Sequence, residues 1–177
     1  MRGLFLGIIA VVSLHSGAIA QNQRTTVTAS NGVEVSIVSD SFAGRSEFTA
    51  PSVRVGDFST AVGNLLVAAI KEGGQTRHFV TGFVIYGGSG WHFYERAIFR
   101  GGTEANFTAG GRDVGRCTRY GGCSHTEEFE IRITPEEIAR HAEQGILPIQ
   151  LRGRSGNTIL FEVPVSYFEA VREVASR

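Results

Sequence analysis

The stretch "NLLVAAIKEGGQTRHFVTGFVIY", residues 64–86, decides the fold. Two apolar-rich runs flank Gly73-Gly74, and glycine adopts positive φ without a steric penalty. Two-residue turns with positive φ at both positions are the commonest connections between antiparallel strands. The stretch therefore predicts a β-hairpin, and its first run is apolar on both faces, which is typical of a central strand covered on both sides. The turn also fixes the register: Val67 pairs with Val80, and Ala69 pairs with His78.

The same turn signal recurs along the chain. Further Gly-Gly pairs stand at 87–88, 101–102, 110–111 and 121–122. The runs between them are apolar or alternating, and such short, regular spacing predicts antiparallel strands joined by tight connections. The run 91–100 is expected to fold back onto the hairpin as a third strand, with Tyr86 opposite Trp91.

A strand and a short helix are predicted after the second cysteine. The segment "EEFEIRI" (127–133) alternates apolar and charged residues, as a half-buried strand does. Helix-start signals follow: Thr134 at the N-cap, Pro135 at the first helical position and Glu137 completing a capping box. Gly145 is expected to end this helix.

A second hairpin is predicted over 146–163. A three-residue loop ending at Gly156, with this glycine in the left-handed conformation, places every apolar side chain on one face. The resulting pairs are Leu151 with Ile159, Ile149 with Phe161, and Leu147 with Val163. Pro164 then ends the strand, and Ser166 and Glu169 form a second capping box that opens a C-terminal helix.

The N-terminal third contains weaker signals. Residues 21–31 are polar and aperiodic, and a flexible tail is expected there. Residues 33–38 are expected to form a strand, and 47–55 an edge strand, because Pro51 cannot donate a hydrogen bond to a sheet.

The chain is therefore expected to be mainly β, with roughly seven or eight strands. The predicted fold is an antiparallel β-sandwich, Ig-like or similar, with two short helices, one between late strands and one at the C-terminus. The alternative is a two-layer α+β fold.

Residues 1–20 have the features of a signal peptide. A positive residue near the start precedes a short apolar segment and an A-x-A cleavage site that ends at Ala20. The apolar segment is too short to span a bilayer as a helix. We therefore expect cleavage near Ala20 and a soluble, exported protein, periplasmic or secreted, with a single β-rich domain over 32–177.

The charge balance argues against two classes of partner. The chain has 17 basic and 17 acidic residues, so its composition does not favour binding to nucleic acid or to an anionic membrane. Lys71 is the only lysine, and this arginine bias favours a bacterial source and hence the periplasm. After the signal peptide, no stretch reaches the ~18 apolar residues of a transmembrane helix.

Both cysteines stand in "GRCTRYGGCSHTEE" (115–128), a segment with three possible interpretations. It is a structural disulfide, a metal site that includes His125 and Glu127, or a reactive thiol. An oxidising compartment favours the disulfide. The spacing matches neither common zinc motifs nor the C-x-x-C of disulfide oxidoreductases. We therefore predict a Cys117–Cys123 disulfide that shapes a local loop, and we predict no metal site and no cofactor.

The sequence contains no strong catalytic motif. The nucleophile elbow G-x-S-x-G is absent, since Trp91 replaces its last glycine in "GGSGW". The zinc motif H-E-x-x-H is absent as well. An enzyme is therefore the less favoured interpretation.

Binding residues are predicted in two places, because arginine and tyrosine are favoured at binding hot spots. The first is the cysteine loop, with Arg112, Arg116, Arg119 and Tyr120, and the second is a strand face with His92, Tyr94 and Arg96. The expected function is a non-enzymatic exported binding or accessory domain, which recognises a protein or a glycan through loops near the disulfide. The alternatives are a hydrolase with a site assembled from scattered residues, and a structural subunit of a periplasmic assembly.

Overall fold

The computed structural model describes residues 23–57, 61–88, 90–117, 119 and 122–177. The predicted signal peptide lies outside the described residues, which form eleven strands and two helices. The elements are β1 (Gln23–Thr28), β2 (Glu34–Asp40), β3 (Arg45–Thr49), β4 (Val53–Asp57), β5 (Ala61–Glu72), β6 (Gln75–Gly88), β7 (Tyr94–Phe99), β8 (Asn106–Cys117), β9 (Cys123–Arg132), α1 (Pro135–His141), β10 (Ile146–Gly153), β11 (Thr158–Pro164) and α2 (Val165–Ser176).

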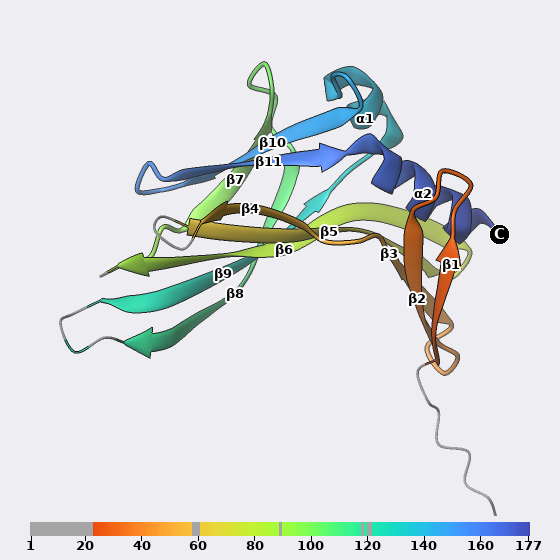
Figure 1. The fold of residues 1–177 in the computed structure, drawn as a ribbon, viewed down its shortest axis with the longest axis horizontal. Coiled ribbons are helices and arrows are strands. Elements are labelled where there is room, and N and C mark those ends of the chain that lie inside the picture. Colours follow the sequence, from red (N-terminus) through yellow and green to blue (C-terminus); the bar gives the residue numbers. More distant parts are fainter. Residues whose placement is uncertain (1–22, 58–60, 89, 118, 120–121) are drawn as a thin grey trace, which may run out of the picture.

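The strands form two antiparallel sheets (Figure 1). The large sheet has the order β1-β2-β3-β5-β6-β9-β8, and β4 pairs with β5 beyond the end of β3. The small sheet has the order β11-β10-β7 and lies over one part of the large sheet. Helix α2 contacts β2, β3, β5 and β6 of the large sheet. The prediction of a mainly β, sandwich-like fold with two short helices is confirmed.

Both predicted hairpin registers are confirmed. In β5–β6, Val67 pairs with Val80 and Ala69 with His78. Gly73 and Gly74 have φ values of 56° and 77°, as the turn requires. In β10–β11, the observed pairs are Leu151 with Ile159, Ile149 with Phe161, and Leu147 with Val163. The glycine of this loop, Gly156, has a φ of 85°.

The predicted meander is wrong, because the third strand leaves the large sheet. Strand β9, not β7, pairs with β6, and β7 pairs with β10 in the small sheet. The change of sheet follows Phe93, which has a φ of 53° and turns the backbone just before β7 begins. Pairing with β9 places Phe129 and Ile131 beside β6 on the core side, where both are buried. Glu128, Glu130 and Arg132 of the same strand stay exposed.

The N-terminal segment departs from the sequence prediction in two ways. From Gln23 onward the expected flexible tail is instead β1, which is paired with β2 along its whole length. Ser30, just after β1, is held by Glu173 of α2, since its Oγ donates to Oε2 at 2.6 Å. The single edge strand expected over 47–55 is two strands, β3 and β4, and Pro51 lies in the break between them.

Of the predicted helix ends, only the start of α1 is confirmed. The capping box between Thr134 and Glu137 is present at the start of α1. This helix ends at His141 rather than near Gly145, because Glu143 and Ile146 already form a bridge toward β10. The second predicted capping box is absent: α2 begins directly after Pro164, and no side chain caps it. The buried face of α2 includes Phe168, Val171 and Ala175.

One hydrophobic core joins the two sheets and α2. Its largest fully buried side chains are Phe99, Phe161, Leu65, Ile131, Leu147 and Ile149. Each such side chain stabilises the fold by ~1.5–3 kcal/mol through burial. This core fixes the ends of β6, β7 and β9, where polar groups gather.

Candidate functional site

Strand β9 carries two polar side chains on its core-facing side. Successive residues of a strand point to opposite faces, so His125 and Glu127 share the face of Phe129 and Ile131. Both are buried, with 6% and 2% of their surface exposed. A buried carboxylate is costly unless it is hydrogen-bonded, so Glu127 requires hydrogen-bond donors around it.

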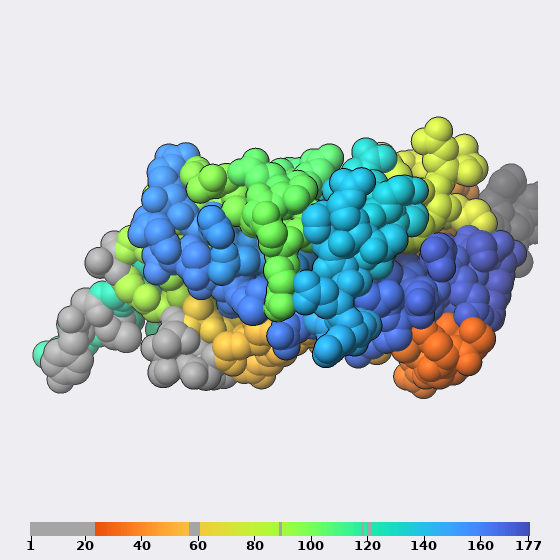
Figure 2. Space-filling view, turned by 90° about the horizontal axis from the view of Figure 1, so that it is seen from above, coloured from red at the N-terminus to blue at the C-terminus, as the bar shows by residue number. Residues whose placement is uncertain are grey.

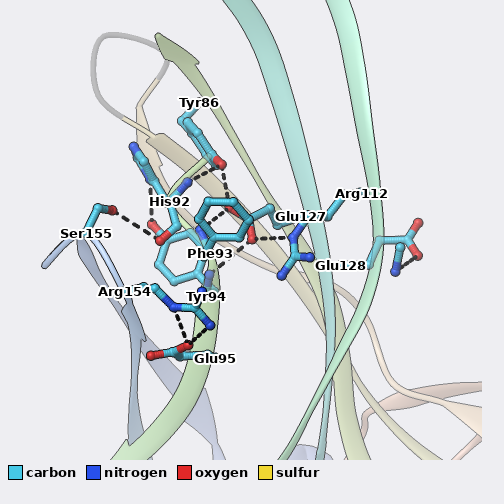
Figure 3. A network of polar contacts seen from close by, with 11 residues as sticks. Tyr86, His92, Phe93, Tyr94, Glu95, Arg112, Glu127, Glu128, Arg154 and Ser155 are labelled. Carbon is cyan, nitrogen blue, oxygen red and sulfur yellow. Dashed lines mark hydrogen bonds and ion pairs between the residues drawn. The ribbon is translucent and has the colours of Figure 1, made fainter. Parts of the chain in front are cut away.

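Glu127 accepts hydrogen bonds from four donors (Figure 3). Its Oε1 accepts from the Tyr86 hydroxyl and, at 2.8 Å, from the backbone N–H of Phe93. Its Oε2 accepts from the backbone N–H of Tyr94 and from Nε of Arg112, both at 3.1 Å. These donors come from β6, β7, β8 and the segment before β7, so one carboxylate joins both sheets.

The segment before β7 is held from several sides. Phe93 is a non-glycine residue in the left-handed region, a conformation that costs ~1–3 kcal/mol. Its N–H donates to Glu127, and its carbonyl accepts from the backbone N–H of Arg154 at 3.0 Å. Its ring lies under two guanidinium groups, 5.0 Å from Arg112 and 5.6 Å from Arg154. These contacts offset the backbone strain and fix the loop between β6 and β7.

Aromatic rings extend the network. The His92 ring stacks on Tyr86 with 3.5 Å between centroids, and the backbone N–H of His92 donates to the Tyr86 hydroxyl at 2.7 Å. Nδ1 of His92 lies 3.3 Å from the Tyr94 hydroxyl. His125 stacks on Tyr86 at 5.5 Å and meets the edge of Trp91 at 4.7 Å.

The charges in this network are fixed at neutral pH. Burial alone would raise the pKa of Glu127, but hydrogen bonds from Tyr86, Arg112 and two backbone N–H groups outweigh it and lower that pKa. Burial raises the pKa of Tyr86, and it raises the pKa of Tyr94 to about 12. Burial lowers the pKa of His92, although Glu127 acts in the opposite direction. The hydrogen-bonded network therefore holds one carboxylate anion, the Arg112 cation and the neutral rings of Tyr86, His92 and Tyr94.

A hollow opens beside the network, with a volume of ≈ 490 Å³. His92 and Tyr94 form part of its wall, and the start of β11 forms another part, including Asn157 and Thr158. This volume lies within the ~300–1,000 Å³ range of small-molecule sites.

The structure divides the predicted binding residues into three groups. Arg112, His92 and Tyr94, taken from the two predicted places, meet around Glu127. Arg116 and Arg119 are exposed on either side of Cys117, whereas Tyr120 lies outside the described residues. Arg96 takes no part in the network, since it is exposed and pairs with Glu104 at 3.5 Å.

The sequence interpretation missed three residues of the hydrogen-bonded part of the network: Tyr86, Phe93 and Glu127. A signal for Glu127 was present, because a period of two from Phe129 and Ile131 places it on the core side. No local pattern indicated Tyr86 or Phe93. Their partners come from other strands, and the predicted meander placed those strands wrongly.

The predicted disulfide is confirmed. Cys117 and Cys123 are bonded, and they face each other at the ends of β8 and β9 with 3.9 Å between their α-carbons. The bond closes the turn that carries Arg119. Glu127 lies on β9, four residues after Cys123.

Removing the disulfide is expected to have a moderate, local effect. The double substitution Cys117→Ser/Cys123→Ser should lower the free energy of unfolding by ~2 kcal/mol, because the closed loop is short. Urea unfolding of the oxidised and substituted proteins measures the difference. Peptide-level hydrogen exchange should show faster exchange at the β8–β9 turn and unchanged exchange in β5. Faster exchange throughout β5 would contradict a local role.

The described residues limit the chemistry of this region. Among them, no three His, Cys, Asp or Glu side chains lie close enough together to share a metal ion. Neither of the helices they form is long and apolar enough to cross a membrane. In comparisons with known proteins, the chain matches no family model, no curated protein and no solved structure.

Proposed function

We propose that this protein is an exported, non-enzymatic binding domain that recognises a protein partner at the disulfide end of the sandwich. One observation carries the proposal: Arg112, His92 and Tyr94 gather around Glu127, and the strands beside this network, β8 and β9, end at a disulfide-closed turn where Arg116 and Arg119 are exposed on either side of Cys117. A rigid surface loses less entropy on binding than a flexible one. Exposed arginines on such a surface are favoured as binding hot spots.

The electrostatics favour binding over catalysis. A general acid or base works best with a pKa near the operating pH. In this network the pKa values are shifted away from neutral pH. Those of Tyr86 and Tyr94 are raised, and that of Glu127 is lowered. Glu127 also accepts four hydrogen bonds already, which leaves it little capacity to accept a substrate proton. The carboxylate is better suited to holding the loop than to reacting.

Two features support export. Residues 1–20 have the composition of a signal peptide. The Cys117–Cys123 disulfide is compatible with an oxidising compartment, where such bonds persist.

Affinity capture with matched arginine variants tests the binding proposal. The wild-type protein, Arg116→Ala/Arg119→Ala and the control Arg24→Ala/Arg45→Ala are used as bait in periplasmic extract, and bound proteins are quantified by mass spectrometry. The control arginines are exposed on β1 and β3, at the other end of the large sheet (Figure 1). We expect a partner whose recovery falls ~10-fold or more with the first variant and is unchanged with the control.

Two results of this capture experiment would count against the proposal. Equal recovery of every bound protein by all three baits would exclude the turn as the recognition surface. A glycan that binds the wild type and not the first variant, with no protein partner, would replace a protein by a glycan as the ligand.

A further inference from the structure

A second hollow lies far from the disulfide, between the two helices. Figure 2 shows α1, in cyan-blue, beside α2, in dark blue, on the surface of the molecule. The groove between them has a volume of ≈ 290 Å³. Its walls are mainly apolar: Pro135, Ile138, Ala139 and Ala142 come from α1 and its end, Ile133 from the end of β9, and Val165 and Phe168 from α2.

The lining of the groove also includes a histidine and an arginine. His78 of β6 and Arg172 of α2 both line it. Burial lowers the pKa of His78, and the positive charge of Arg172 lowers it further. The guanidinium therefore acts directly on the imidazole. Among the described residues, Arg172 forms no ion pair, so its charge is available to a ligand.

Other charged groups at the groove are few. On α2, Glu169 also lines it, three residues before Arg172. Glu169 is not among the causes of the His78 pKa shift, whereas Arg172 is. The lining residues from α1 and from the end of β9 have no charged side chain. Of the two charged side chains that line the groove, Arg172 is therefore the one that acts on His78, and its cation favours an anionic ligand group there.

The groove is also of a definite size. At about 30 Å³ for each water-sized group, ≈ 290 Å³ accommodates about ten non-hydrogen atoms. An apolar chain of this size would lie between Ile138 and Phe168, where its burial would supply most of the affinity.

We propose that the groove between α1 and α2 binds a small monocarboxylate with an apolar body, whose carboxylate pairs with Arg172 beside His78 while the body lies against Ile133, Ile138 and Phe168. This site does not depend on the binding function at the disulfide end. It has its own residues, on elements at the other side of the molecule (Figure 1).

The probe for this proposal is octanoate, which has an apolar chain and one carboxylate in about ten non-hydrogen atoms. Binding to the purified protein is measured by NMR titration, with octylammonium as the control of equal length and opposite charge. We expect saturable shifts at Ala139 and Phe168 with octanoate, and binding of octylammonium that is about fivefold weaker or more, since each ~1.4 kcal/mol changes affinity tenfold.

Three variants separate the contributions to binding. Arg172→Gln should weaken octanoate binding about fivefold, whereas Arg140→Gln, on α1 outside the groove, should leave it unchanged. Ala139→Phe fills the groove from an exposed position and should abolish binding while the protein stays folded. Far-UV circular dichroism of each variant provides the folding control.

The pH dependence provides an independent readout. A bound carboxylate favours the charged imidazole, so octanoate should raise the pKa of His78 and take up protons on binding. Affinity should then rise about threefold between about pH 7.5 and about pH 5.5. Absence of saturable binding, equal binding of octylammonium, or equal effects of Arg172→Gln and Arg140→Gln would each overturn the proposal.

Discussion

Replacing Glu127 by alanine is expected to lower the free energy of unfolding by ~3–5 kcal/mol, because each buried donor that loses its acceptor costs ~1–3 kcal/mol. The substitution leaves the Tyr86 hydroxyl and two backbone N–H groups without their acceptor, and it leaves Arg112 without its anion. The left-handed backbone of Phe93 loses a hydrogen bond that offsets its strain. Urea unfolding followed by tryptophan fluorescence measures the change.

The neighbouring residue supplies the matched control. Glu128 is exposed and accepts one long hydrogen bond, 3.3 Å from the backbone N–H of Gly111. Glu128→Ala should therefore change the free energy of unfolding by less than ~1 kcal/mol. Similar losses for Glu127→Ala and Glu128→Ala would show that the buried network does not organise this end of the fold.

Acid pH should weaken the same network. The folded-state pKa of Glu127 lies below its ordinary value of 4.5, so ionised Glu127 stabilises the folded state. That stabilisation is complete above the unfolded-state pKa and is lost as pH falls through the folded-state pKa. The difference in unfolding free energy between wild type and Glu127→Gln should therefore shrink as pH falls below about 4.5. A difference that stays constant across this range would mean that Glu127 titrates as in the unfolded chain.

Local patterns of the sequence predicted the local structure well. Two glycine turns fixed two hairpin registers, because strand pairing across a short turn has few geometric alternatives. The capping box at Thr134 predicted the start of α1 for a similar reason, since all of its hydrogen bonds lie within one helical turn. These features depend on residues that are close in the sequence.

The arrangement of strands between the two sheets was not predictable in the same way. The run that begins after Gly90 resembles a third meander strand, yet Phe93 turns it toward β10. The energy that favours this path comes from Glu127, which lies 34 residues further along the chain from Phe93. No pattern within the run itself contains that partner.

Distant partners in the sequence also explain why only some of the predicted binding residues meet around Glu127. Arg112, His92 and Tyr94 were predicted as binding residues, and they are the residues that hold Glu127 or border it. Arginine, histidine and tyrosine are suited both to recognition and to buried polar networks. The residue type alone does not distinguish the two roles. The burial of Glu127 does, because a desolvated carboxylate requires several donors.

The second large effect on stability is expected at Gly63, where the two sheets are in contact. Gly63 of β5 faces β11, and a Cβ added there would lie 2.4 Å from Cζ of Phe161 and 2.9 Å from Cδ1 of Ile159. Phe161 is fully buried. Gly63→Ala should therefore lower the free energy of unfolding by ~2–3 kcal/mol through overpacking. Urea unfolding again measures the change.

A double-mutant cycle shows whether the clash is the cause. Phe161→Leu removes the ring atoms that the new methyl group would meet, at a cost of its own of ~1–2 kcal/mol. In that background Gly63→Ala should cost less than ~1 kcal/mol, a coupling within the range known for residues in contact. Gly87→Ala is the control, because Gly87 lies on the neighbouring β6 and a Cβ there meets nothing within 4 Å. Equal costs of Gly63→Ala in both backgrounds would show that the loss arises in β5 itself, and that the two sheets do not pack through this glycine.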